Sequence, residues 1–180
     1  MASDGAKAIG IILIIVIVLS IVGVGVYYVM TYNSLVSENE QIDSQWAQVQ
    51  NQYQRKIDLI PTLVATVENY QQFESETLMS IIELRSQWMN ATTVEEQVNI
   101  SNQLDSQLAT IIVTYEEYPD LQSIYLVSNL MVELTNTENK ISTERMFYND
   151  YVRAYNSHIK KWPASWVANN NGFEERNYYA

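Results

Sequence analysis

The hydrophobic pattern begins with an uninterrupted apolar stretch. Residues 8–30 read AIGIILIIVIVLSIVGVGVYYVM, 23 residues without a charge, and Ser20 is the only polar side chain before Tyr27. A helix rising about 1.5 Å per residue can cross a hydrocarbon core of about 30 Å with this length. Since no polar face interrupts the stretch, we predict a transmembrane helix over 8–30, preceded by a short N-terminal segment, 1–7.

Two alternatives to a retained anchor concern cleavage. A secretory signal would need a shorter apolar core followed by small residues, whereas bulky side chains follow here. A prepilin-type leader cut after Gly10 is disfavoured because nothing downstream has the pattern of a pilin sheet. We therefore expect a signal-anchor, with Tyr27, Tyr28 and Tyr32 as membrane-interface residues in an aromatic belt.

The orientation of this anchor rests on few charges. Lys7 precedes the span and the next basic residue is Arg55, so the positive-inside rule favours a cytoplasmic N-terminus with the domain outside. Glycosylation-type sequons begin at Asn90 and Asn99; they are compatible with that orientation but decide nothing alone. We predict a single-pass protein of the cell membrane.

A seven-residue repeat follows the apolar stretch. In two interleaved series that start at Tyr32 and Leu35, 13 of 17 positions are apolar or aromatic, which is typical of a helix in a bundle. The series begins two residues beyond Met30, which predicts one nearly continuous rod of membrane helix and stalk. Pro61 lies within the series, either as a kink in one long helix or as a break between two; its neighbours favour a kink.

Two further helices can be delimited from their ends. Thr93 and Glu96 form a capping-box pattern at the start of one, and residues 118–120 end it. The other has apolar positions three and four residues apart from Ile124 to Trp162, and Pro163 stops it.

These elements predict an all-α fold in which the N-terminal transmembrane helix continues into an antiparallel up-down bundle of three to four long helices. The bundle domain is expected over 31–163. The remaining residues, 164–180, form an aromatic C-terminal tail.

A few charged residues interrupt the apolar seams. Lys56, Glu74, Glu138 and Arg145 occupy seam positions, and Asn39 does the same near the membrane. A buried charge needs a partner, since an unpaired one costs several kcal/mol. We interpret the four charged residues as a structural polar layer that fixes helix register, in preference to a ligand or proton site.

Charge and composition restrict the function. Residues 38–120 contain 14 Asp and Glu against 3 Lys and Arg, whereas residues 121–180 balance six against six. An acidic body of this kind repels nucleic acid and anionic headgroups, so nucleic-acid binding is not expected. The chain has no cysteine, which excludes disulfides and thiolate chemistry.

Several ordered motifs resemble those of the LemA family, from the anchor nearly to the C-terminus. Mild departures are Trp162 where the family usually has Phe, Phe73 where His is common, and Lys56 where Arg is frequent. The resemblance implies one transmembrane helix and an up-down bundle, but no settled activity. The matching stretches are residues 32–36, 50–61, 63–64, 66–67, 118–121, 133–134, 137–141, 148–149, 152, 155–156, 162–163 and 172–173.

Candidate chemistry is sparse. His158, the single histidine, lies beside a seam without a Ser or Asp motif, and no Glu-x-x-His pair exists for a di-iron site. The acidic residues of 116–120 lack the alternating ligands of a calcium loop. We therefore predict no catalytic, cofactor-binding or metal-binding residues, no cofactor and no enzyme activity.

Aromatic side chains crowd the C-terminal end. Their ordinary role would be packing across the end of the bundle, and a possible oligomer contact is the alternative. The residues concerned are Trp162, Trp166, Phe173, Tyr178 and Tyr179.

Two functions remain compatible with this sequence. The first is a membrane-anchored scaffold that self-associates as a homo-oligomer in the lipid bilayer. The second is a tethered adaptor that binds another membrane protein in envelope quality control or signalling. An enzyme would require a bound metal or cofactor. The rod-like continuity of span and stalk favours lateral assembly.

Overall fold

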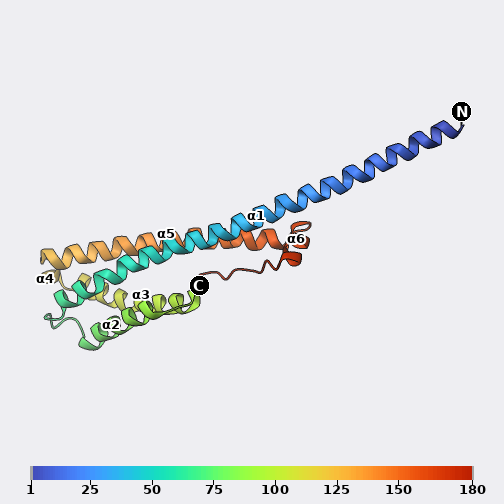
Figure 1. Cartoon of the computed structure of the whole chain (residues 1–180). Coiled ribbons are helices and arrows are strands. Elements are labelled where there is room, and N and C mark those ends of the chain that lie inside the picture. The colour runs from blue at the N-terminus through green and yellow to red at the C-terminus, as the bar shows by residue number, and fades with distance from the viewer. Residues whose placement is uncertain (1, 180) are drawn as a thin grey trace. The chain divides into compact units, whose positions relative to one another are not determined.

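The protein is all-α, as predicted. The computed structural model describes residues 2–179, and this part of the chain is helical with no strand. The side chain of Lys7, on which the orientation prediction rests, lies outside the described residues, as do Met1 and Ala180 at the ends of the first and last expected segments. The helices are α1 (Ala2–Val67), α2 (Ser75–Asn90), α3 (Val94–Glu117), α4 (Pro119–Gln122), α5 (Tyr125–Lys160) and α6 (Ala164–Asn171) (Figure 1).

Helix α1 is continuous for 66 residues and runs through the expected end of the span. Pro61 lies inside it and does not separate two helices. The chain leaves the helix after Val67 and turns over residues 68–74 before α2 begins. The seven-residue count that continues through Glu74 is therefore wrong in that segment, since the register cannot cross a turn.

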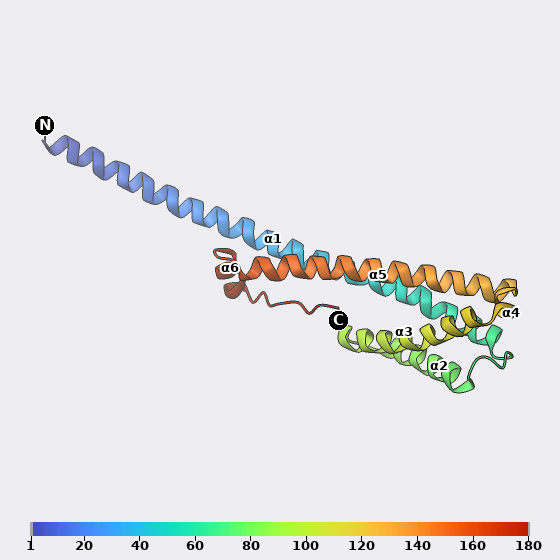
Figure 2. The ribbon, with the colours of Figure 1, turned by 180° about the vertical axis from the view of Figure 1, so that it is seen from behind.

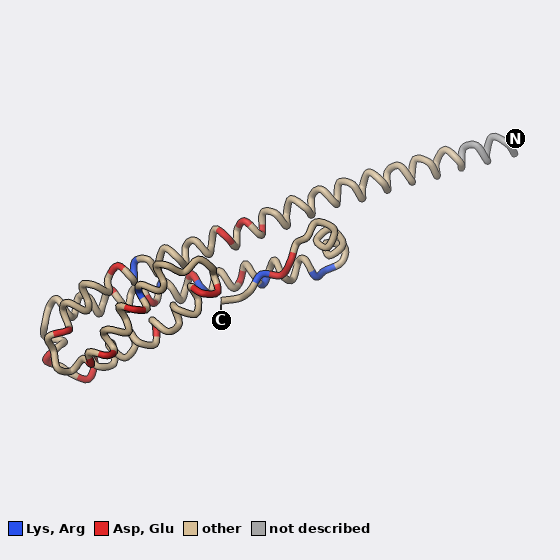
Figure 3. Tube along the Cα trace, turned by 60° about the horizontal axis from the view of Figure 1, so that its bottom comes forward, with Lys and Arg blue, Asp and Glu red and all other residues tan. Residues whose placement is uncertain are grey.

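The N-terminal part of α1 is the one candidate membrane span among the described residues. Its most apolar 18-residue window has a mean hydropathy of 3.2 and no buried residue. Large apolar side chains from Ile9 to Met30 are exposed, and no Lys, Arg, Asp or Glu colours this stretch in Figure 3. A helix with apolar side chains on all sides and no protein packed around it is long and apolar enough to cross a bilayer.

The chain divides into two compact units. The first comprises the residues up to Asp43 together with Asp150–Asn177, and the second comprises Ser44–Asn149 with the C-terminal residues from Tyr178.

The second unit is an up-down-up-down bundle. Along α1 and α5, Trp46 contacts Tyr148 and Lys56 pairs with Glu138, so the two segments run antiparallel. Helices α2 and α3 form a hairpin, in which they lie side by side in both views (Figures 1 and 2). The capping box at Thr93 is confirmed and starts α3. Fully buried core side chains are Val49, Tyr53, Ile57, Ile60, Val67, Ile81, Leu104, Leu108, Ile111, Val127 and Ile141.

In the first unit, the end of α5 packs along α1 and is followed by α6. His158 of α5 lies with Nδ1 2.9 Å from Oε1 of Glu38 on α1. Helix α6 was not predicted, because its residues belong to the stretch expected as an irregular tail. Gly172 ends α6 with a φ of 71°, a left-handed conformation that glycine adopts without strain.

The C-terminal segment is held by two asparagine side chains of α5, one in each unit. In the first unit, Asn156 accepts a hydrogen bond from the Arg176 N–H at 2.9 Å and donates to its carbonyl at 2.8 Å. In the second unit, Asn149 makes the same pair of bonds to Tyr179, at 2.8 and 3.0 Å. Each asparagine amide thus bonds both the N–H and the carbonyl of one residue of the segment, as a neighbouring β-strand would do.

Candidate functional site

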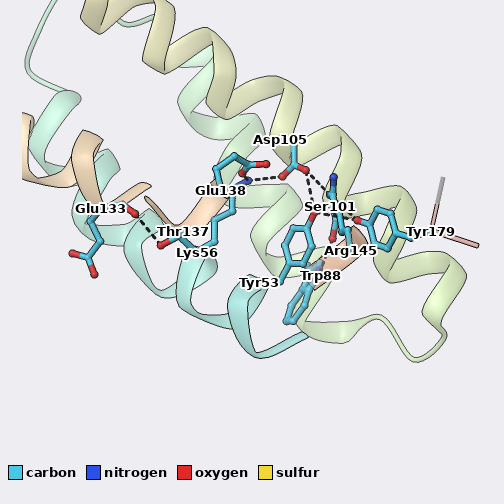
Figure 4. Close-up of polar contacts among 10 residues, drawn as sticks. All are labelled: Tyr53, Lys56, Trp88, Ser101, Asp105, Glu133, Thr137, Glu138, Arg145 and Tyr179. Carbon is cyan, nitrogen blue, oxygen red and sulfur yellow. Dashed lines mark hydrogen bonds and ion pairs between the residues drawn. The ribbon is translucent and has the colours of Figure 1, made fainter. Parts of the chain in front are cut away.

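The most unusual feature of the second unit is a buried cluster of charged and polar side chains contributed by three helices and the C-terminal segment (Figure 4). Lys56 of α1 is only 1% exposed. Its ammonium lies 2.5 Å from Oδ1 of Asp105 on α3 and also pairs with Glu138 of α5. Lys56 can be buried here because its charge meets two carboxylates while its methylene chain packs in the seam.

A ring of hydrogen bonds surrounds the other oxygen of Asp105. Arg145 donates to Oδ2 of Asp105 at 2.7 Å and to the Tyr179 hydroxyl at 2.7 Å. Tyr53 donates to the same Oδ2 at 3.0 Å, and the two tyrosine hydroxyls are 3.0 Å apart. Since the single hydroxyl hydrogen of Tyr53 goes to Asp105, the hydrogen between the tyrosines belongs to Tyr179. The ring is therefore closed.

Aromatic packing supports this ring. The guanidinium carbon of Arg145 lies 4.2 Å from the ring centre of Tyr179 and 5.3 Å from that of Tyr53. Beside it, Trp88 of α2 donates to the buried hydroxyl of Ser101 at 3.1 Å. The cluster thus connects α1, α3, α5 and the C-terminal segment directly, and its aromatic edge extends to α2.

Burial controls the protonation of the cluster. It raises the pKa of the Asp105 carboxyl to about 6, although the Lys56 ammonium opposes this rise. Burial also raises the pKa of Tyr179 above its ordinary range, so its hydroxyl stays neutral, and it lowers the pKa of Arg145. At neutral pH, two cations thus face two carboxylates, of which Asp105 contacts both cations.

This arrangement is suited to holding helices in register. The phenols are neutral hydrogen-bond donors, and both carboxylates are engaged by cations. A metal ion between Asp105 and Glu138 would have to displace the Lys56 ammonium. No group of three or more potential metal-binding side chains occurs in the part of the chain that the structure describes.

Three of the four residues expected in the polar layer lie together: Lys56, Glu138 and Arg145. Glu74 does not join them; it is exposed and precedes the first residue of α2. Asp105, the residue that joins both cations, was missed. It lies beside the apolar row of α3 rather than in it, one residue after the buried Leu104, and nothing in the sequence distinguishes it from an acidic residue on a surface helix.

The expected membrane-interface tyrosines lie around the last apolar turn of α1. Tyr27 and Tyr32 are each 39% exposed. Tyr28 packs edge-on against Trp166 of α6, with ring centres 5.6 Å apart, and Tyr32 packs in the same way against Phe173 at 5.8 Å.

The C-terminal aromatics have different environments. Tyr179 is buried in the polar cluster, whereas Tyr178 is half exposed. Trp166 and Phe173 contact α1 within the first unit. Trp162, expected at the end of the α5 seam, is 84% exposed and is not part of that seam. Helix α5 ends at Lys160, and the turn that follows takes the Trp162 side chain out of the helical register.

A long apolar helix leads into an up-down bundle that a buried ionic cluster ties together. Among the described residues this helix is the one candidate anchor, so the fold defines a class of helical protein with a candidate membrane anchor. Within that class, the LemA family matches residues 45–180, and the chain belongs to this family. The resemblance seen in the sequence is thereby confirmed.

This chain is also similar to three curated proteins. Magnetosome protein MamQ 2 of Paramagnetospirillum magneticum is 24% identical over 93% of this chain and 71% of its own length. Protein LemA of Metamycoplasma hominis is 26% identical, over 82% and 69%. Magnetosome protein MamQ of Magnetospirillum gryphiswaldense is 23% identical, over 90% and 69%.

Proposed function

We propose that this protein is a non-catalytic, membrane-anchored helical scaffold whose bundle self-associates at the membrane. The anchor is the apolar part of α1, and the chain remains single-pass with its bundle outside. Two relatives are named for the magnetosome and one only as LemA, so no reaction or partner is carried over from them.

The observation that carries the proposal is a second apolar face on α2. Met79, Ile82 and Met89 are 61%, 48% and 55% exposed. Their spacing places them on one side of the helix, beside the buried row that includes Leu78, Ile81 and Trp88. A row of large apolar side chains left open to water on a folded domain is typical of an interaction surface.

Membrane anchoring would allow a small apolar surface such as that of α2 to support self-association. Chains held in one bilayer share an orientation and a high local concentration, so a weak contact between identical faces becomes populated. The acidic charge of the bundle opposes this association, which keeps it reversible. Methionine suits such a contact because its flexible side chain adapts to different neighbours.

Self-association can be tested by crosslinking, because the chain has no cysteine of its own. Ser86 is exposed and lies between Ile82 and Met89, so a single Ser86→Cys substitution places a thiol within the α2 face. In native-lipid particles with an added mild oxidant such as copper phenanthroline, this variant is expected to form a disulfide-linked dimer of the full chain. The exposed Ser106→Cys on α3 is the control and should crosslink far less.

Light scattering on the full chain provides the second measurement. The wild type should be larger than a monomer, and the pair Ile82→Gln and Met89→Gln should shift it toward monomer. The pair retains the charge of the chain, and Val113→Gln, another exposed apolar residue, is the matched control. A wild-type monomer at all protein-to-lipid ratios would refute the scaffold and leave the adaptor.

Membrane anchoring is tested separately. The full chain should resist extraction from membranes at alkaline pH and should float with lipid vesicles. Release by carbonate would contradict an integral anchor.

A further inference from the structure

Helix α6 is attached to α1 at the level where the apolar segment ends. Besides the contact of Trp166 with Tyr28, the side-chain amide of Asn171 donates to the Tyr28 hydroxyl at 2.8 Å. Both views show α6 beside α1 (Figures 1 and 2). The position of α6 along α1 is thus defined within the first unit.

The length of the apolar segment sets the depth of Tyr28. About 20 residues cross the hydrocarbon core, so the 23 apolar residues allow core windows from 8–27 to 11–30. Tyr28 then lies one residue outside the core or three residues inside its edge. At about 1.5 Å per residue, Tyr28 and its partner Trp166 are within about 5 Å of the boundary in either case.

Two indoles are exposed in and just before α6. Trp166 is 52% exposed, and Trp162, in the turn before α6, is 84% exposed. Indole combines a large apolar surface with one hydrogen-bond donor, and it is enriched at the level of lipid headgroups. Lys161 is exposed immediately before Trp162, and an ammonium there can bind lipid phosphates.

We propose that Trp162 and Trp166 dock on the headgroup region of the same bilayer that the anchor spans. This inference rests on the proposed membrane anchoring and reassigns the two tryptophans from an oligomer contact to a lipid contact. The occupant is the lipid surface because the exposed indoles are continuous with the end of the span. A single helix in a bilayer is free to rotate about its own axis. With α6 docked as a second attachment point, the rotation of α1 about its axis would be fixed.

The test uses the full chain in phosphatidylcholine vesicles and its own fluorescence. Four tryptophans are present, so Phe replacements at Trp46, Trp88 and Trp162 leave Trp166 as the only indole, and the corresponding set leaves Trp162. A variant that retains only Trp88, which is 7% exposed in the second unit, is the control. Lipids brominated near the headgroup should quench Trp162 and Trp166 strongly, lipids brominated near the chain ends should quench them weakly, and neither should quench Trp88.

A second measurement leaves all tryptophans in place. Asn169→Cys puts a unique thiol on the exposed side of α6, and a nitroxide attached there should report a depth at the headgroup level. This readout does not depend on whether the triple Phe variants fold.

Three results would overturn the proposal. Indoles quenched by aqueous iodide but not by brominated lipid would place them in water. Indoles shielded from both quenchers in proportion to protein density would indicate a second copy of the chain as the occupant. A nitroxide with the mobility and accessibility of a water-exposed site would likewise place α6 in water. Vesicle flotation separates these outcomes from failure of the anchor, since a chain that floats with unquenched indoles has an anchor but no docked α6.

Discussion

Replacement of Lys56 by methionine is the sharpest test of the buried cluster. Methionine keeps an unbranched apolar side chain in the seam and removes only the ammonium. Two carboxylates lose their contact with this ammonium: Asp105, with a side chain 19% exposed, and Glu138, with a side chain 38% exposed. The loss of stability therefore comes mainly from the unpaired Asp105, because water can solvate the more exposed Glu138.

The expected magnitude follows from the burial of this pair. Removing one partner of a buried ion pair costs about 3–5 kcal/mol. The Asp105 pKa of about 6 is held down by Lys56, so it should rise in the variant. The loss should therefore be larger at pH 8 than at pH 5, by about 1.4 kcal/mol for each unit by which this pKa rises.

The assay is urea unfolding of the full chain in detergent, followed by circular dichroism at several pH values. Lys140→Met, an exposed substitution on α5, is the matched control and should change the free energy of unfolding by less than about 0.5 kcal/mol. The double variant with Asp105→Asn should recover part of the loss, since the more buried of the two carboxylates is then absent and water can solvate Glu138. A Lys56→Met protein as stable as the wild type at pH 8, or a loss independent of pH, would refute the reasoning.

Three further outcomes are expected. Burial raises the pKa of Asp105 in the folded state, so its bound proton stabilises the fold fully below about pH 4, and this stabilisation is lost as the pH rises through 6. Over that interval the free energy of unfolding of the wild type should fall by about 3 kcal/mol relative to that of Asp105→Asn, measured by unfolding at each pH. Thr93→Ala removes the cap of α3 and should cost about 1 kcal/mol, seen as a lower Tm. Self-association of the acidic bundle should strengthen as salt is added, since screening reduces repulsion; weaker association at high salt by light scattering would contradict an apolar contact.

The helical fold could be predicted because the signals are local. An apolar stretch, a seven-residue repeat and a capping box each depend on neighbouring residues, and the helices that they predict are present. The turn after Val67 could not be located in the same way. Residues 68–74 continue the polar and apolar spacing closely enough that counting passes over the turn and assigns Glu74 to a seam.

The polar cluster was only partly predictable, for a physical reason. Lys56 and Arg145 interrupt apolar seams, so the sequence marks them as unusual. Asp105 lies at the edge of the α3 row, where an acidic residue would be ordinary on a surface helix, and only the fold shows that two cations face it. Tyr179 is distant in sequence, and its own backbone N–H and carbonyl bond to the side-chain amide of Asn149, a contact that no sequence pattern reveals.

The two asparagine contacts to the C-terminal segment recognise peptide groups and not side chains. Such recognition is indifferent to which residue occupies the bound position, apart from proline, which has no N–H to offer. The asparagines themselves have no substitute of equal size: aspartate cannot donate, and leucine can do neither. Among related chains we therefore expect Asn149 and Asn156 to be constant wherever the segment is bound, whereas the bound residues are restricted only by their own side-chain contacts, such as that of the Tyr179 hydroxyl with Arg145.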